Sequence, residues 1–147
     1  MDLEHTIDDG MNAIQTACRD PRLLPGAGTT EVEASLLMKQ YGDTSLGLDQ
    51  YAIRAFAKSL EFVPKTLAQN AGQDATTILA ASTASHVNGN KSSGVDILGE
   101  SEIKEDMAVM DLYLTKRTAL KLALDAALTV LKVDQIIMSK PSGGPNK

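Results

Sequence analysis

Aromatic side chains are scarce in this sequence: they make up 3% of its 147 residues, and tryptophan is absent. The interior must therefore be built from the aliphatic part of a hydrophobic fraction of 43%. Alanine and leucine dominate that part, and both favour helices that pack closely. A chain of this length suits one domain rather than two.

Three further absences narrow the class of protein. Cys18 is the single cysteine, so no internal disulfide can form, which is typical of a reducing compartment. The sequence has no run of 18 uncharged apolar residues and starts on an acidic stretch, so it predicts neither a membrane span nor a secretory signal. A net charge of −5 makes nucleic acid an unexpected partner. We therefore expect a soluble, intracellular, mostly helical domain.

Helical periodicity runs through most of the chain, and it predicts helices over residues 2–19, 30–41, 49–70, 74–85 and 111–132. Pro64 either kinks the third helix or begins another, because it removes one intrahelical hydrogen bond. Thr30 with Glu33 resembles a capping box, and Asp74 is a further cap. Two apolar stripes are expected to face the core: Leu3, Ile7, Met11, Ile14 and Cys18 on the first helix, and Leu120, Leu124, Ala127, Leu128 and Leu131 on the last.

The remaining segments are short. Residues 86–94 are rich in Asn, Gly, Ser and Lys, which predicts a surface loop. Residues 95–98 alternate in polarity like one arm of a hairpin, and the β-branched residues 133–138 resemble a strand. The tail, residues 140–147, is expected to be flexible. The predicted fold class is mainly α: a helical bundle with a short β-hairpin and a C-terminal strand.

Carboxylates and a glycine-containing loop are the candidates for chemistry. Asp8 and Asp9 are adjacent and so lie on different faces of a helix. They are either a solvated acidic pair or include one carboxylate that polarises a water for phosphoryl transfer. The segment 26–28, Gly-Ala-Gly, opens a helix whose free N–H groups favour anions, although it is neither a Walker A loop nor a GxGxxG fingerprint. Asp111 begins the last helix, where capping alone explains a carboxylate.

Three other reactive residues carry no such pattern. His5 and His86 lack a second ligand at metal-binding spacing and are interpreted as surface or loop residues. Cys18 has no base nearby in the sequence and is expected to pack as a small apolar residue. The residues alone leave two hypotheses open: part of a nucleotide-dependent machine, or a helical interaction module without a ligand.

Four stretches together resemble the group II chaperonins. Residues 6–12 are similar to the "ERAIDDGVN" segment of that family, and residues 22–31 to its "RLVPGGGATE" segment. Residues 51–72 are similar too, as is the end of the chain with its motif VDQIIMSKPSGGP, residues 133–145. Because the similarity extends from about Asp2 to Pro145, the combination is specific.

The resemblance implies a domain layout and partners. Residues 1–20 are then the end of an intermediate domain, 21–139 the C-terminal half of an equatorial, ATP-binding domain, and 140–147 a flexible tail. Subunits of this family assemble with other chaperonin subunits in a hetero-oligomeric double ring in the cytoplasm. They use ATP and Mg²⁺ to fold clients such as actin and tubulin. Residues 133–138 are expected to join a sheet with a neighbouring subunit, because an unpaired strand edge invites association.

The resemblance also implies roles on the phosphate side of a nucleotide. Asp9, which stands 17 residues before Gly26, matches the aspartate that helps to activate the attacking water. Gly26, Ala27 and Gly28 match the three-glycine loop beside the nucleotide, with alanine in place of the middle glycine.

On the adenosine side, Asp96 matches a segment beside the adenine. Asp111 matches an acidic residue that hydrogen-bonds the ribose hydroxyls, a role that suits a carboxylate acceptor, and Lys116 is expected near the same site. The family's phosphate-binding loop and magnesium-holding aspartate belong to its N-terminal half, and its client-binding domain is likewise not among these residues. We therefore expect no metal site here and no ATP hydrolysis by this chain alone.

Overall fold

The computed structural model describes residues 3–97, 103–104 and 109–138. Within them the chain is mainly α, as predicted. Six described helices follow one another: α1 (Leu3–Arg19), α2 (Thr29–Thr44), α3 (Asp49–Leu60), α4 (Phe62–Asn70), α5 (Ala75–Val87) and α6 (Tyr113–Leu131). The predicted tail, residues 140–147, lies outside the described residues.

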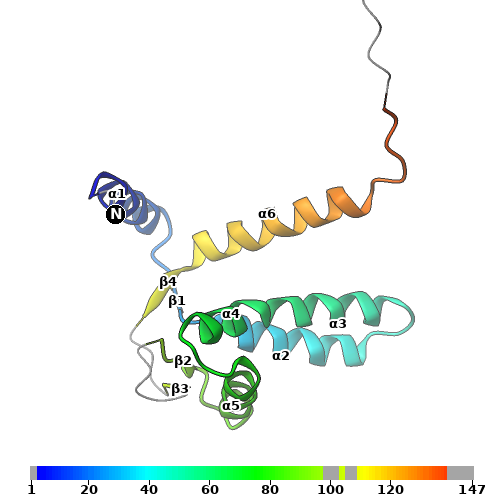
Figure 1. Cartoon of the computed structure of the whole chain (residues 1–147), viewed down its shortest axis with the longest axis horizontal. Helices are drawn as coiled ribbons and strands as arrows, with labels where there is room; N and C mark the ends of the chain where they lie inside the picture. Colours follow the sequence, from blue (N-terminus) through cyan, green and yellow to red (C-terminus); the bar gives the residue numbers. More distant parts are fainter. Residues whose placement is uncertain (1–2, 98–102, 105–108, 139–147) are drawn as a thin grey trace, which may run out of the picture.

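Helices α2 to α5 form the packed part of the molecule. α2 and α3 run side by side as a hairpin, and α4 and α5 pack against each other and against α2 (Figure 1). The buried apolar side chains come from these helices and from the strand next to them: Val32, Ala57, Leu60, Ala68, Ile78 and Val95. These six are all aliphatic, which agrees with the low aromatic content of the sequence.

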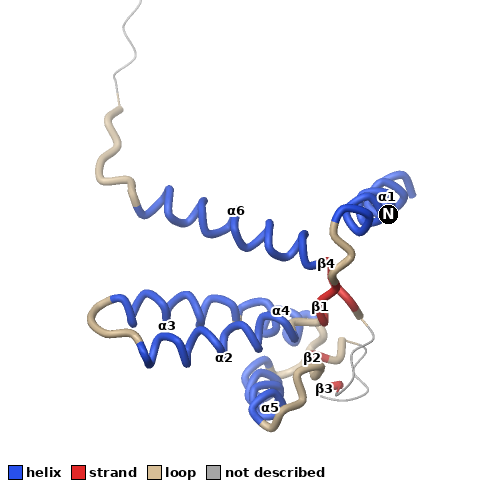
Figure 2. Tube along the Cα trace, turned by 180° about the vertical axis from the view of Figure 1, so that it is seen from behind, coloured by secondary structure: helices blue, strands red, loops and turns tan. Residues whose placement is uncertain are grey.

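Two short antiparallel ladders lie beside this helical group (Figure 2). β1 (Leu23–Pro25) pairs with β4 (Met110–Leu112), which places Leu24 opposite Asp111. β2 (Gly94–Val95) pairs with β3 (Ile103–Lys104), so the predicted hairpin is confirmed at its described ends. The β1–β4 ladder was not predicted, because its two strands are far apart in the sequence and each has only three residues.

Helix ends agree with the sequence where the signal is local. Asp74 caps α5, and its carboxylate accepts two backbone N–H groups of the first turn, as predicted. Pro64 lies in the first turn of α4, so it begins a helix rather than kinking one. The predicted capping box of α2 is wrong. Gly28 occupies the N-cap position without a side-chain bond, and the Thr30 hydroxyl instead donates to the backbone oxygen of Pro25 at 2.6 Å.

The apolar stripes of α1 and α6 are exposed, contrary to the prediction. Leu3 is 74% exposed and Leu131 78%, and neither helix has a buried residue among its described side chains. Periodicity indicates a face that is suited to burial, but burial needs a second surface. α1 and α6 stand apart from the group α2–α5 (Figure 1), so these faces lack one among the described residues. Cys18 on α1 is exposed for the same reason, not packed as expected.

The C-terminal strand expected at residues 133–138 does not form within the single chain. Residues 133–138 follow α6 without strand structure, and Ile136, Ile137 and Met138 are each at least 78% exposed. β-branched side chains favour an extended backbone, but a strand forms only where a second edge supplies hydrogen bonds. The described ladders involve other residues, so this segment has no such edge in the part of the chain that the structure describes.

Candidate functional site

The loop Gly26-Ala27-Gly28 is fixed by backbone contacts on both sides. The N–H of Gly26 donates to the oxygen of Val109 at 2.8 Å, and the N–H of Val95 donates to the oxygen of Ala27 at 3.1 Å. Gly28 has a φ of +79°, and a Cβ there would lie 2.9 Å from the Cβ of Pro64, so only glycine fits. Ala27 also has a positive φ, +54°, which is costly for a residue with a side chain.

Asp111 lies directly against this loop. A Cβ on Gly26 would be 3.3 Å from Oδ2 of Asp111 and 3.2 Å from the backbone oxygen of Val109. Asp111 belongs to β4, and α6 begins only at Tyr113, so the prediction that Asp111 starts this helix is wrong. Its position is set by the β1–β4 ladder instead. The ladder therefore brings Gly26 and Asp111, which are far apart in the sequence, next to each other.

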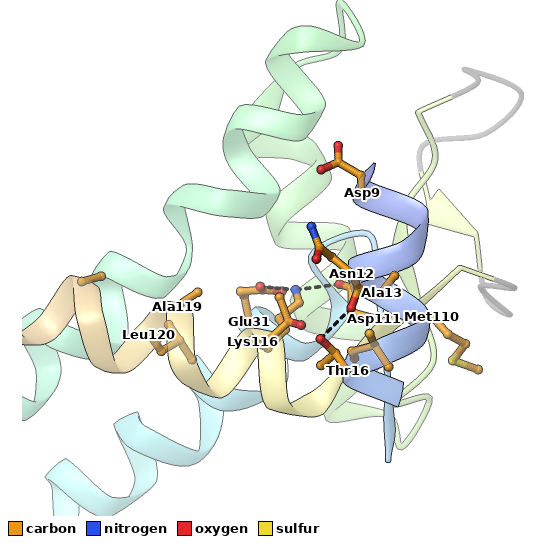
Figure 3. A pocket seen from close by; sticks show the side chains of 13 residues that line it. Asp9, Asn12, Ala13, Thr16, Glu31, Met110, Asp111, Lys116, Ala119 and Leu120 are labelled. Carbon is orange, nitrogen blue, oxygen red and sulfur yellow. Dashed lines mark hydrogen bonds and ion pairs between the residues drawn. The ribbon is translucent and has the colours of Figure 1, made fainter. Parts of the chain in front are cut away.

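Lys116 joins Asp111 to a third charged residue, Glu31 of α2. Its ammonium lies 2.9 Å from Oδ2 of Asp111 and also contacts Oε1 of Glu31 (Figure 3). The exposed fractions of the three side chains are 8% for Glu31, 19% for Lys116 and 38% for Asp111. Burial lowers the pKa of Lys116, but the hydrogen bonds and charges of Glu31 and Asp111 outweigh it and raise the pKa above its usual value.

A pocket of about 870 Å³ opens over this cluster, between α1, β4 and the first turns of α6. Its polar lining comes from Asp9, Asn12, Thr16, Glu31, Asp111, Thr115 and Lys116, and alanine, leucine and methionine side chains complete the wall. Asp9 lies on α1 at the edge of the pocket, apart from the charged cluster (Figure 3). The neighbouring Asp8 does not line it. The pocket thus has an acidic floor, small apolar walls and one ammonium.

Asp96 lies elsewhere. It follows β2, is 5% exposed, and its backbone oxygen accepts a hydrogen bond from the Gln73 amide at 3.1 Å. It does not line the pocket of Asp9 and Asp111. The structure therefore brings Asp9, Asp111 and Lys116 together in one pocket, with Gly26 of the loop against Asp111. Asp96 lies outside this pocket, although its neighbour Val95 donates to Ala27 of the loop.

Sequence reasoning missed Glu31 and misplaced His86. Glu31 stands in the first turn of α2, right after the glycine loop, but its partner Lys116 lies 85 residues further along the chain. His86 was expected at the surface, whereas it is 4% exposed and belongs to α5. Its ring nitrogens face Glu33 at 3.0 Å and the backbone oxygen of Ser93 at 2.9 Å.

Among the described residues, no three His, Cys, Asp or Glu side chains gather to hold a metal ion. In the same part of the chain, no helix has the length and apolar character that a membrane span needs.

A model of the TCP-1/cpn60 chaperonin family matches residues 1–141. The chain therefore belongs to the TCP-1/cpn60 chaperonin family, and its resemblance to chaperonins is confirmed. Its fold is similar to that of a solved structure described as the open state monomer of a group II chaperonin from Methanococcoides burtonii. The TM-score is 0.79 at 31% identity, over 89% of this chain and 33% of that one.

Within this family, the chain is similar to T-complex protein 1 subunit theta. It is 51% identical to the subunit from Arabidopsis thaliana over 148 residues, and 47% identical to that from Homo sapiens over 147. These alignments cover 99% and 98% of this chain. The chain spans 27% of the length of these curated relatives.

Proposed function

We propose that this chain forms part of the ATP-binding equatorial domain of a chaperonin subunit, and that its pocket holds the adenosine end of ATP. One observation carries the proposal: Asp111, tied to Lys116 and Glu31, lies directly under the glycine loop in a pocket of about 870 Å³. A carboxylate that accepts hydrogen bonds, next to a glycine loop whose backbone a ligand can approach closely, suits a ligand with hydroxyl groups.

The residues of the pocket have separate roles in this proposal. Asp111 accepts hydrogen bonds from ribose hydroxyls, with Lys116 beside it, and the loop 26–28 lets the nucleotide approach the backbone. Asp9, on the edge of the same pocket, helps to activate the attacking water in the complete subunit. Asp96 lies beside the adenine in this proposal, next to Val95, whose N–H donates to Ala27 of the loop.

Among the described residues no three metal-ligating side chains gather, and we place the Mg²⁺ site in the rest of the complete subunit. Phosphoryl transfer depends on metal and phosphate clamps, so this chain by itself is expected to bind nucleotide weakly and not to hydrolyse it. In the complete subunit, ATP with Mg²⁺ drives the folding of cytosolic proteins such as actin and tubulin. Its partners there are other chaperonin subunits in a hetero-oligomeric double ring in the cytoplasm. The family match and the theta relatives support this wider proposal.

Calorimetric titration of the 147-residue chain with ATP and Mg²⁺ tests the pocket. We expect saturable binding that weakens about tenfold in Asp111→Ala, because a hydrogen bond to a charged acceptor is lost. Asp43→Ala is the matched control, since Asp43 pairs only with the exposed Arg54 on the α2–α3 hairpin among its described contacts. Equal affinity in all three proteins, or no binding by the parent, would reject the pocket.

A helical interaction module without a nucleotide is the second candidate. The exposed apolar faces of α1 and α6 favour it, because such faces mark protein contacts. Absence of nucleotide binding, together with concentration-dependent association, would leave this candidate standing alone.

A further inference from the structure

Glu31 is a buried carboxylate, and one of its two oxygens has a partner among the described residues. The residue is 6% exposed, its Oε1 contacts the Lys116 ammonium, and its Oε2 is buried without a hydrogen-bond partner among the described residues. A buried carboxylate is costly unless a charge compensates it. Lys116 supplies that charge, so Glu31 holds Lys116 in place.

The Lys116 ammonium contacts two carboxylates, Glu31 and Asp111, which differ in burial. Its ammonium has three donors, and it reaches Glu31 on one side and only Oδ2 of Asp111, at 2.9 Å, on the other. Electrostatic attraction strengthens as water is excluded, and Glu31 is far more buried than Asp111. The deeper acid therefore draws the ammonium away from the second oxygen of Asp111.

We propose that Glu31 is a positioning residue of the adenosine pocket: it anchors Lys116 and so keeps Oδ1 of Asp111 open as an acceptor for a ligand hydroxyl. This inference rests on the proposed function, and it gives a reason why the pocket would select ligands with ribose hydroxyls. Two carboxylates and one ammonium leave the cluster with one net negative charge. Such a site favours hydroxyl donors over phosphate at this end of the pocket.

The action of Glu31 through Lys116 has a specific signature. Without the Glu31 carboxylate, the ammonium is free to turn fully onto Asp111 and occupy both of its oxygens. The variant should then lose discrimination for ribose hydroxyls while its fold remains. A residue with only a structural role would change stability and leave this discrimination as it was.

The test compares adenosine with 2′,3′-dideoxyadenosine by NMR titration of the parent chain, Glu31→Gln and Glu61→Gln. Both ligands are neutral, so the changed charge cannot act through phosphate groups. Glu61→Gln is the matched control, because Glu61 is also largely buried and contacts two lysines, Lys39 and Lys65, away from the pocket.

We expect the parent and Glu61→Gln to prefer adenosine by about tenfold, the effect of a hydrogen bond to a charged group, and Glu31→Gln to fall to about twofold. A folded Glu31→Gln that keeps the preference of the parent would overturn the proposal. If Glu31→Gln does not fold, the double variant Glu31→Gln/Lys116→Met removes both charges together. With no ammonium left to occupy Asp111, it should fold and keep the preference for adenosine, and loss of that preference in this double variant would also overturn the proposal.

The ammonium signal of Lys116 gives a readout without any ligand. In Glu31→Gln the buried charged partner is lost and the ammonium moves to the more exposed Asp111, so its protons should exchange with water several times faster in ¹H–¹⁵N spectra. If the parent binds neither nucleoside, the proposed nucleotide pocket fails, and this signal still decides the role of Glu31. An unchanged Lys116 signal would overturn it.

Discussion

The ring nitrogen Nδ1 of His86 lies 3.0 Å from Oε2 of Glu33, which ties α5 to α2 inside the packed group. The other ring nitrogen, Nε2, lies 2.9 Å from the backbone oxygen of Ser93. Each ring nitrogen therefore faces one oxygen acceptor. His86 thus joins two helices and the segment that leads to β2.

His86→Ala should destabilise the chain by about 2–4 kcal/mol, because it removes the polar contacts of a buried ring and leaves a cavity. Chemical unfolding followed by circular dichroism measures the change. His5→Ala on the exposed face of α1 is the control and should shift the free energy of unfolding by less than about 0.5 kcal/mol. Equal effects of the two substitutions would contradict this role.

Acid should weaken the contact of Glu33. Hydrogen bonds from Lys91 first and His86 second lower the pKa of Glu33 below its usual 4.5, against the opposing effect of burial. A carboxyl whose pKa is lowered by folding adds stability above its unfolded pKa and loses it as pH falls through the folded pKa. The stability difference between the parent and Glu33→Gln should therefore shrink as pH falls below 4.5. Urea unfolding between pH 7 and pH 3 tests this, and a constant difference would argue against it.

Gly28→Ala should be strongly destabilising, by about 2–4 kcal/mol, because it combines a positive φ with a steric clash. Its Cβ would lie 2.9 Å from the Cβ of Pro64. Gly47→Ala separates the two causes, since Gly47 also has a positive φ, +83°, but open space around it. That control should cost about 1 kcal/mol. Thermal unfolding ranks the variants, and equal losses would show that the contact with Pro64 does not matter.

Ala27→Gly should raise stability, by up to about 1 kcal/mol, despite the larger entropy of glycine in the unfolded chain. The reason is the φ of +54° at Ala27, which strains a residue with a Cβ. Ala55→Gly, in the middle of α3, is the opposite case and should cost about 1 kcal/mol. If both substitutions lower the midpoint of thermal unfolding, Ala27 is not strained.

The apolar faces of α1 and α6 should make the chain associate. Ile7 and Met11 of α1 are 58% and 63% exposed, and Leu122 of α6 is 62% exposed. Sedimentation velocity at increasing concentration should show species larger than a monomer, and Ile7→Lys with Leu122→Lys should reduce them. A monomer at all concentrations would contradict this prediction.

The sequence was informative where a feature depends on neighbours in the chain. Asp74 marks a helix start through contacts within one turn and was predicted correctly, and of the two alternatives left open for Pro64 the structure has the helix start. The resemblance selected Asp9, Asp111, Lys116 and the loop 26–28, and the structure gathers them around one pocket and its adjoining loop.

Features that need a distant partner were missed or wrong. The contact between Glu31 and Lys116 spans 85 residues, and neither residue carries a local sign of the other. The buried position of His86 depends on Glu33, which is 53 residues away. For residues 133–138, the composition favours a strand, but no strand edge among the described residues pairs with this segment.

The three-residue ladder between β1 and β4 has a mechanical consequence. Arg22, between α1 and β1, accepts the backbone N–H of Tyr113 on its carbonyl at 3.0 Å, and its guanidinium stacks 4.1 Å from the centre of the Tyr113 ring. Any rotation of α1 about residues 20–22 must therefore pull on the start of α6 and on the strand that carries Asp111. The strand pair therefore couples the orientation of α1 to the position of Asp111 in the pocket.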